Sequence, residues 1–434
     1  MSRWLKIILV ILAVTPVVIM ASLIAQYAVN VPFGDDWVLA QLFQKADSGT
    51  LGLSDFWALH NEHRVFFPKL FMFMVANLTD WNIRVQIWLN FVLMFSTALV
   101  IANLVYKGIR KVWVSLSIIV VMSFWFFSPV QSENWIWAWQ FSWYLTILTV
   151  LVTFVLINKV KNLQSSAVLF IICAALSVIA SFSLGGGSAV WLIGLIILYF
   201  NSTGKQSYIT WSFMGLITNL IYYVGYSKPS TSPSILYFLE HKQDTLVYFV
   251  TLIGRPISDN QQTSILIGLL ILGSLLPLSI AIWYKRKDIR KFVPIMAMSA
   301  YCMVTLGLTT ISRVGFGVEQ ATASRYTTLT IIFIVSILIM IGFVLDTTRD
   351  SKSSMHKIQI GLAAIIVINA PLIVFSYHTG IDSLKQRAWH MELAYQCTHQ
   401  EVVTDECANV TFPGFGGVVK DNSIFIKDKS WGGY

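Results

Sequence analysis

The chain has 434 residues, of which 56% are hydrophobic and only 12% are charged. Soluble domains carry about a quarter charged residues, so this composition excludes an ordinary soluble enzyme and predicts a membrane protein. The net charge of +9 does not indicate a nucleic-acid partner, because the basic residues are dispersed in short loops between apolar runs.

A helix needs roughly 20 apolar residues to cross a bilayer. On that criterion the sequence predicts an all-α polytopic fold with about eleven membrane helices. The expected spans are 6–29, 81–105, 112–129, 137–157, 167–183, 188–202, 207–226, 263–284, 292–312, 327–346 and 358–377. The first is expected to be retained, because its apolar run is longer than the core of a signal peptide and no convincing cleavage site precedes Val31.

The distribution of charge predicts the orientation of these spans. Lys and Arg gather in alternate loops, such as 285–291, while most Asp and Glu fall in the others. Since basic residues concentrate on the cytoplasmic side, the amino terminus is expected inside. An odd number of spans then exports the tail, 378–434, where Cys397 and Cys407 are close enough to form a disulfide.

The membrane domain, 1–377, is expected to carry two large outer loops, 30–80 and 227–262. In the first loop, apolar spacing predicts helices lying along the membrane surface at 38–47, 53–59 and 64–78. In the second loop, prolines precede a similar surface helix that is interrupted between Glu240 and Asp244. These two loops are expected to form the floor and lid of any outer site.

Two adjacent carboxylates, Asp35 and Asp36, follow the first span directly. A carboxylate at the end of a lipid-facing helix is costly to desolvate, so we expect it to face a wet cavity. The functional interpretation is a general base that deprotonates an acceptor hydroxyl, with Trp37 beside the substrate. The alternative is a helix cap, for which the second carboxylate has little use.

A second polar cluster follows in the same loop, with His60, Glu62, His63, Arg64 and Lys69. A spacing of three would place the two histidines on one face of a helix, as for metal ligands, but the zinc-protease pattern is absent. We expect instead a surface facing an anion, with Arg64 and Lys69 near a phosphate. A solvated helix face is the structural alternative.

Aromatic residues crowd the short outer segment 130–136 and the start of the next span. Trp135 and Trp139 lie there with Glu133, where they are expected to stack on a sugar ring or a polyprenyl chain. An aromatic belt at the membrane surface would explain the same residues without any function.

The outer arginines nearest to span ends are Arg255, Arg313 and Arg325, and the last two enclose Glu319 in a polar segment that ends at Tyr326. Guanidinium groups bind phosphate in a bidentate manner and stay charged when half buried, which suits the binding of a lipid phosphate. Simple snorkelling to the interface is the alternative for Arg325.

The predicted topology, the Asp35-Asp36 pair and the Ser324-Arg325-Tyr326 segment resemble the GT-C superfamily of polyprenyl-phosphate-sugar-dependent glycosyltransferases. The small size and short outer tail are most similar to the serotype-converting O-antigen glucosyltransferases of bacteria and their phages. The large outer domain of oligosaccharyltransferases is missing, which argues against a protein acceptor.

This resemblance implies inverting transfer of a sugar, expected to be glucose, from undecaprenyl phosphate to a lipid-linked or lipopolysaccharide O-antigen glycan. The base would be Asp35 or Asp36, and the site would face the periplasm from the bacterial inner membrane. A divalent cation is left open as a cofactor; a flippase and a donor-synthesising glycosyltransferase are the expected partners. The alternative is a transporter or flippase for a lipid-linked saccharide, for which internal repeats and charges within the spans would be expected.

Overall fold

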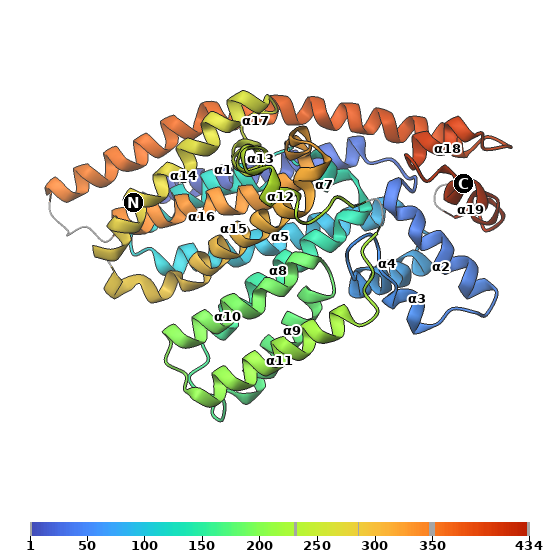
Figure 1. Cartoon of the computed structure of the whole chain (residues 1–434). Helices are drawn as coiled ribbons and strands as arrows, with labels where there is room; N and C mark the ends of the chain where they lie inside the picture. Colours follow the sequence, from blue (N-terminus) through green and yellow to red (C-terminus); the bar gives the residue numbers. More distant parts are fainter. Residues whose placement is uncertain (1, 230–231, 285, 347–351, 432–434) are drawn as a thin grey trace.

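The computed structural model describes residues 2–229, 232–284, 286–346 and 352–431, and within these ranges the chain is helical and has no strand. The long helices run alongside one another in a bundle, with α9, α10 and α11 forming a group on one side (Figure 1). Short helices gather at one end of this bundle. Helix α1 (Arg3–Tyr27) begins at one end of the molecule, and α19 (Gly416–Asp428) lies at the other (Figure 1).

Each expected span is occupied by a helix, which confirms the all-helical prediction. These helices are α1 (Arg3–Tyr27), α5 (Ile83–Gly108), α6 (Val112–Phe126), α8 (Phe141–Ile157), α9 (Ala167–Ser181), α10 (Ala189–Phe200), α11 (Lys205–Tyr223), α14 (Gln261–Tyr284), α15 (Val293–Arg313), α16 (Thr327–Asp346) and α17 (Lys352–Thr398). Within the described ranges, seven helical segments are long and apolar enough to cross a membrane: Arg3–Tyr27, Ile83–Gly108, Ala138–Ile157, Gln261–Tyr284, Ile289–Phe316, Ser324–Asp346 and His356–Thr398. The other expected spans are shorter or less apolar, so their number stays a prediction.

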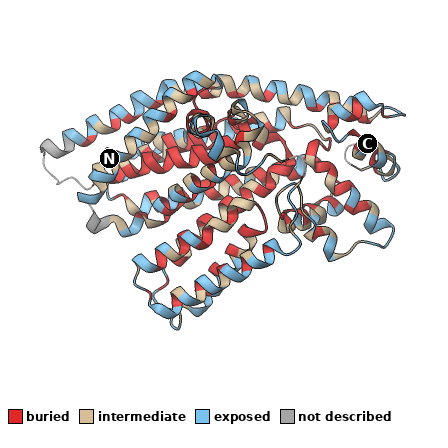
Figure 2. Ribbon diagram, in the orientation of Figure 1, coloured by how far each residue is buried: buried red, intermediate tan, exposed pale blue. Residues whose placement is uncertain are grey.

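Helix α16 forms the centre of the bundle. Its sequence is apolar on every side, as expected of a helix surrounded by protein, and 83% of its span is buried. Helix α14 lies at the edge, where only 6% of its span is buried and Leu270 and Leu276 are exposed. Figure 2 shows the same contrast between a buried interior and exposed outer helices. The outward apolar side chains form a surface suited to lipid.

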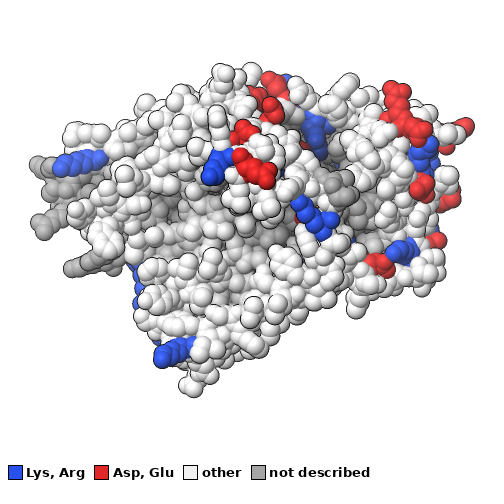
Figure 3. All heavy atoms as spheres, in the orientation of Figure 1, with Lys and Arg blue, Asp and Glu red and all other residues white. Residues whose placement is uncertain are grey.

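The end of the bundle that carries the amino terminus is held by polar contacts between loops. The buried carboxylate of Asp346 accepts the backbone N–H groups of Arg110 and Lys111, at 2.8 and 3.1 Å. Asn158 donates to the carbonyl of Arg290 at 3.3 Å. In Figure 3, Lys and Arg are visible at this end, whereas Asp and Glu gather toward the other. This asymmetry agrees with the orientation expected from the sequence, which stays a prediction.

The first expected outer loop contains a helix near each of the three predicted positions, while their place along a membrane surface stays a prediction. Its helices are α2 (Val38–Asp47), α3 (Leu53–Trp57) and α4 (Phe66–Leu78), preceded by the 3-10 turn η1 (Gly34–Trp37). The second outer loop differs from the prediction. It contains α12 (Tyr237–Glu240) and α13 (Lys242–Gly254), with the expected interruption between them. However, α13 buries Tyr248, Thr251 and Ile253 against the bundle, so it is an internal helix rather than a surface helix.

Helix α17 is longer than predicted. The expected span, 358–377, continues without a break to Thr398, so the first part of the expected tail is helical and extends beyond the bundle. Gly380 allows this extension to pack closely, because a Cβ at that position would lie 2.2 Å from the backbone nitrogen of Val130. The extension therefore lies directly against the segment that joins α6 to α7 (Ser132–Ile136).

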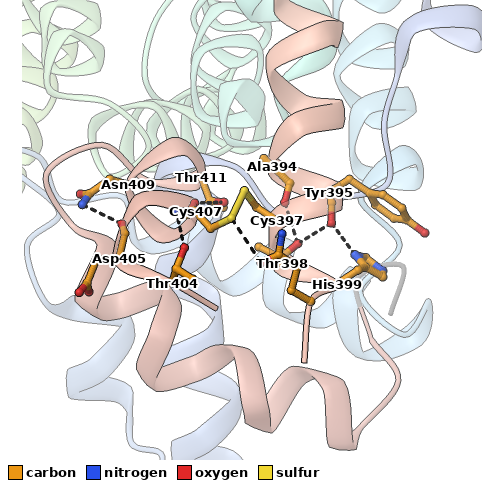
Figure 4. The surroundings of a disulfide bond; sticks show 11 residues. Ala394, Tyr395, Cys397, Thr398, His399, Thr404, Asp405, Cys407, Asn409 and Thr411 are labelled. Carbon is orange, nitrogen blue, oxygen red and sulfur yellow. Dashed lines mark hydrogen bonds between the residues drawn. A yellow bond between two sulfur atoms is a disulfide. The ribbon is translucent and has the colours of Figure 1, made fainter. Parts of the chain in front are cut away.

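The carboxyl terminus forms a small cap on the first outer loop. Figure 4 shows the disulfide between Cys397 and Cys407, which ties the end of α17 to α18 (Asp405–Thr411). Helix α19 (Gly416–Asp428) then packs on α2, with Lys429 paired with Asp47 at 2.5 Å and Trp431 edge-on to Phe43. The cap therefore covers the helix that follows η1.

Alkylation tests this disulfide and the side of the membrane on which the tail lies. Cys173 and Cys302 are free and buried, so protein extracted without reductant and then denatured should expose two thiols, rising to four after reduction. The measurement is mass spectrometry of alkylated peptides. Four thiols without reductant would contradict an oxidising location for the tail.

Candidate functional site

A cavity of about 680 Å³ lies at the end of the bundle that carries the first outer loop. It is enclosed by residues 60–63 and Val65, by the start of α8 and the turns η2 (Ala138–Gln140) and η3 (Gly185–Ser188), and by the ends of α11 and α15. One side is apolar, with Leu192 and Leu308 on lipid-facing parts of α10 and α15. The opposite side carries acidic, basic and imidazole groups. The cavity therefore joins a polar site to an apolar surface.

The turn η1 places the two neighbouring carboxylates in different surroundings. Gly34 has a φ of +57°, a conformation that side chains rarely adopt, and a Cβ there would lie 3.1 Å from the ring of Trp137. The Trp137 indole N–H donates to the carbonyl of Phe33 at 2.8 Å. As a result Asp35 lines the cavity, with 23% of its side chain exposed, whereas Asp36 turns inward and is buried.

Asp36 closes the turn instead of facing the cavity. Its Oδ2 atom accepts the backbone N–H of Phe33 at 3.1 Å. Burial, and then the charge of Asp35, raise the pKa of Asp36 to about 8. A carboxyl group that is largely protonated at neutral pH, and that does not line the cavity, is a poor candidate for the base.

The raised pKa of Asp36 predicts a specific dependence of stability on pH. The folded protein binds this proton more tightly than the unfolded chain, so wild-type stability should fall as the pH rises from 3.8 towards 8. Asn can accept the same hydrogen bond but does not titrate. We therefore expect the melting temperature of Asp36→Asn, measured in detergent, to rise relative to that of the wild type as the pH increases from 3.8 towards 8. A difference that stays constant with pH would show that Asp36 does not titrate there.

Asp35 is paired with His60, whose Nε2 atom lies 3.3 Å from the Asp35 carboxylate. The His60 ring also packs on Trp139 at 4.6 Å between centroids. The alternative in which His60 and His63 share one face of a helix is not what the structure shows. They form an antiparallel bridge with backbone hydrogen bonds of 2.8 and 2.9 Å, because the chain turns at Asn61 with a φ of 50°.

An ion pair between Glu62 and Arg313 lies on the same wall of the cavity, at 2.8 Å. Burial would raise the pKa of Glu62, but a hydrogen bond from Ser232 and the charge of Arg313 hold it below its ordinary value. Burial, followed by the same Arg313 charge, lowers the pKa of His63 to about 4. At neutral pH this wall therefore presents an arginine, a carboxylate and a neutral imidazole.

A second ion pair joins Glu133 to Arg325 at 3.2 Å, and Arg325 also lines the cavity. Glu133 further accepts the backbone N–H of Arg325 and the hydroxyl of Ser324, and it lies 3.5 Å from Arg387. Burial would raise the pKa of Glu133, but the charges of Arg325 and Arg387, together with the hydrogen bonds from the Arg325 N–H and Ser324, hold the pKa below its ordinary value. Tyr326, next to Arg325, lines the cavity as well.

Several residues expected at the site make other contacts and do not line the cavity. The Arg64 guanidinium donates to the carbonyls of Tyr222, Trp57 and Val224. Lys69 is buried and donates to the carbonyl of Ala58 at 2.8 Å. These two cations therefore hold the loop and the end of α11 in place instead of reaching an anion.

Four more residues that were expected at the site also lie outside the cavity lining: Trp37, Trp135, Arg255 and Glu319. The indole N–H groups of Trp37 and Trp135 donate to the carbonyls of Pro32 and Ser128 inside the core. Arg255 is buried and donates to the carbonyl of Thr322. Glu319 is exposed outside the cavity.

Part of the cavity wall was not predicted from the sequence. Asn219, Tyr222 and Tyr223 line it from the end of α11, and Tyr226 lines it from the segment that follows this helix. The sequence signal that could have indicated this wall is the cluster of one asparagine and three tyrosines at and just after the end of one expected span. Within the described ranges, no group of three or more His, Cys, Asp or Glu is placed to hold a metal ion.

No protein-family model matches this sequence, and no curated protein matches it significantly. A solved structure of ArnT from Cupriavidus metallidurans bound to undecaprenyl phosphate is similar, with a TM-score of 0.43 and 13% sequence identity. The alignment covers 99% of this chain and 78% of that one. This degree of similarity does not establish a shared fold, so the function is argued from the site itself.

Proposed function

We propose that this protein is a GT-C-type membrane glycosyltransferase that moves a sugar from a polyprenyl phosphate to a glycan acceptor, with inversion at the anomeric carbon. The observation that carries the proposal is the composition of one cavity. It combines a carboxylate, Asp35, with two arginines, Arg313 and Arg325, and it opens onto apolar side chains of the lipid-facing helices α10 and α15.

The apolar side of the cavity supports a lipid-linked donor. Leu192, Val304 and Leu308 line the cavity and are also exposed on the outer face of the helices. A polyprenyl chain can lie along this surface while its phosphate reaches the polar side. There, Arg313 and Arg325 supply guanidinium groups that are fixed by ion pairs yet 21% and 31% exposed. Such groups stabilise a phosphate bidentately.

The polar side supports transfer rather than simple binding. In the proposed step, Asp35 accepts the proton of an acceptor hydroxyl as its oxygen bonds to the anomeric carbon. The bond from that carbon to the phosphate oxygen breaks, and the lipid phosphate leaves with the electron pair. The arginines stabilise the negative charge that develops on it. The rings of Trp139 and Tyr326 border the same space and suit stacking against a sugar.

We further propose glucose as the sugar, an O-antigen or other lipid-linked glycan as the acceptor, and the periplasmic face of the inner membrane as the location. These details rest on the resemblance of the sequence to serotype-converting glucosyltransferases.

Mass spectrometry of the surface polysaccharide tests this function. Cells that express the protein should add one hexose per repeat unit, and cells without it or with Asp35→Asn should not. Unmodified polysaccharide in cells that hold correctly inserted wild-type protein would contradict the proposed acceptor. Accumulation of an unused lipid-linked saccharide on the inner side after deletion would instead favour a flippase.

A further inference from the structure

Arg387 reaches the base of the η1 turn from a distant part of the chain. It lies on the extension of α17, and its guanidinium carbon is 4.8 Å from the ring centroid of Phe33 and 5.0 Å from that of Trp137. The two rings meet edge to face, with centroids 6.5 Å apart. A cation placed over two aromatic rings in a partly buried setting is held by both.

The contacts of Phe33 and Trp137 determine where Asp35 lies. Phe33 begins the η1 turn, and both of its backbone polar groups are hydrogen-bonded. The Phe33 N–H donates to the Asp36 carboxylate, and the Phe33 carbonyl accepts the indole N–H of Trp137. The Trp137 ring also packs where Gly34 has no side chain. Any shift of these rings would therefore move the residue between Gly34 and Asp36, which is Asp35.

The charge of Arg387 is balanced by Glu133, a residue that also pairs with the cavity-lining Arg325. Its partner is Glu133, at 3.5 Å, which is also bound by Arg325 and Ser324. Loss of Arg387 would thus leave Glu133 paired, and the cavity-facing Arg325 would keep its partner. The side chain is 20% exposed, and its Nε atom is buried without a hydrogen-bond partner among the described residues.

Helix α17 does not depend on Arg387 to stay docked. The hydroxyl of Ser376 is hydrogen-bonded to that of Ser128 at 2.7 Å, and the Tyr377 hydroxyl donates to the carbonyl of Phe127 at 3.2 Å. Gly380 packs on the backbone of Val130. These contacts dock the helix before the chain reaches Arg387, so anchoring the helix does not require a cation over two rings.

We propose that Arg387 is a positioning residue, which fixes the Phe33 and Trp137 rings and thereby holds Asp35 at the distance that proton transfer requires. The inference rests on the proposed function. It gives the carboxyl-terminal segment a part in the reaction, through a residue that does not line the cavity.

Steady-state kinetics of purified protein in nanodiscs test this role, with a polyprenyl-phosphate sugar and a glycan acceptor as substrates. Misplacement of a reacting group by about 1 Å can cost about 100-fold in rate, so Arg387→Ala should lower kcat by about 10- to 100-fold. KM for the donor should stay within about threefold, because the arginines of the cavity are unchanged. Arg387→Lys keeps the charge but not the planar group, so its kcat should lie between those of the wild type and Arg387→Ala.

Lys385→Ala is the matched control, since Lys385 lies on the same helix, is exposed, and pairs only with Asp382 among the described residues. It should leave kcat unchanged. The double variant Phe33→Leu with Arg387→Lys should lose less transition-state stabilisation, calculated from kcat, than the sum of the losses in the two single variants. The reason is that both changes remove the same cation–aromatic contact.

Hydrogen exchange of the peptide that spans residues 31–40 gives a readout that does not depend on activity. Exchange should be faster in Arg387→Ala than in the wild type or in Lys385→Ala. Wild-type kcat and wild-type exchange in Arg387→Ala would overturn the positioning role while leaving the proposed function intact. Absence of transfer by the wild type, with faster exchange in Arg387→Ala, would reject the function but keep the structural role of Arg387.

Discussion

Replacing Asp35 by Asn is expected to lower kcat for sugar transfer by roughly 10²- to 10⁴-fold, the usual contribution of a general base. Asn has nearly the same size and still accepts hydrogen bonds, but it cannot take the proton from the acceptor hydroxyl. The His60 ring, whose Nε2 atom lies 3.3 Å from the Asp35 carboxylate, remains packed on Trp139. The fold and the KM for the donor should therefore change little.

Asp36→Asn is the matched control, because it makes the same chemical change one residue away. Asp36 is buried and accepts the N–H of Phe33, which Asn can also do, so most of the activity should remain. Wild-type transfer by Asp35→Asn would exclude Asp35 as the base. Loss of activity in Asp36→Asn alone would move that role to Asp36.

Replacing Arg325 by Ala is expected to weaken binding of the donor by about 10- to 100-fold, because a hydrogen bond to a charged group is worth about 1.5–3 kcal/mol. Glu133 would still be paired with Arg387, so the change leaves no unpaired buried carboxylate. This affinity is measured by titrating the protein with the polyprenyl phosphate alone while monitoring tryptophan fluorescence. The KM for the acceptor should change less.

Arg84→Ala serves as the comparison, since Arg84 is an arginine at the start of α5 that does not line the cavity. It should bind the donor phosphate as the wild type does. Equal affinity in Arg325→Ala and the wild type would remove Arg325 from the phosphate site. Arg313, which is paired with Glu62, would then be the remaining cation for that role.

The helices were predictable because long apolar runs leave few other structures in a membrane. Helix α13 was misjudged because the charges at its start, such as Lys242 and Asp244, resemble a surface segment, whereas its second half is buried. The length of α17 was missed because polar residues after 377 end an apolar run without ending a helix. Hydropathy reports the surroundings of a helix, and not where its hydrogen bonds stop.

The site was predictable where polar residues follow a span directly. Asp35, His60 and Glu62 from the segment between α1 and α5, and Arg313 and Arg325 from the segment around the end of α15, all line one cavity. Their roles in binding and catalysis stay predictions. Arg64 and Lys69 were expected there too, but their partners are backbone carbonyls, and a sequence pattern does not show which carbonyls lack a hydrogen bond. Arg387 was missed for a related reason. Its contacts with Phe33 and Trp137 exist only because α17 continues past the bundle.

The configuration of the transferred sugar tests the central claim most directly. If Asp35 activates an acceptor hydroxyl for a single displacement on the polyprenyl-phosphate sugar, the product must carry the anomeric configuration opposite to that of the donor. NMR of the product formed by purified protein from a donor of known configuration measures this. Inversion is the predicted result, and retention, or no transfer by correctly folded protein, would contradict the account.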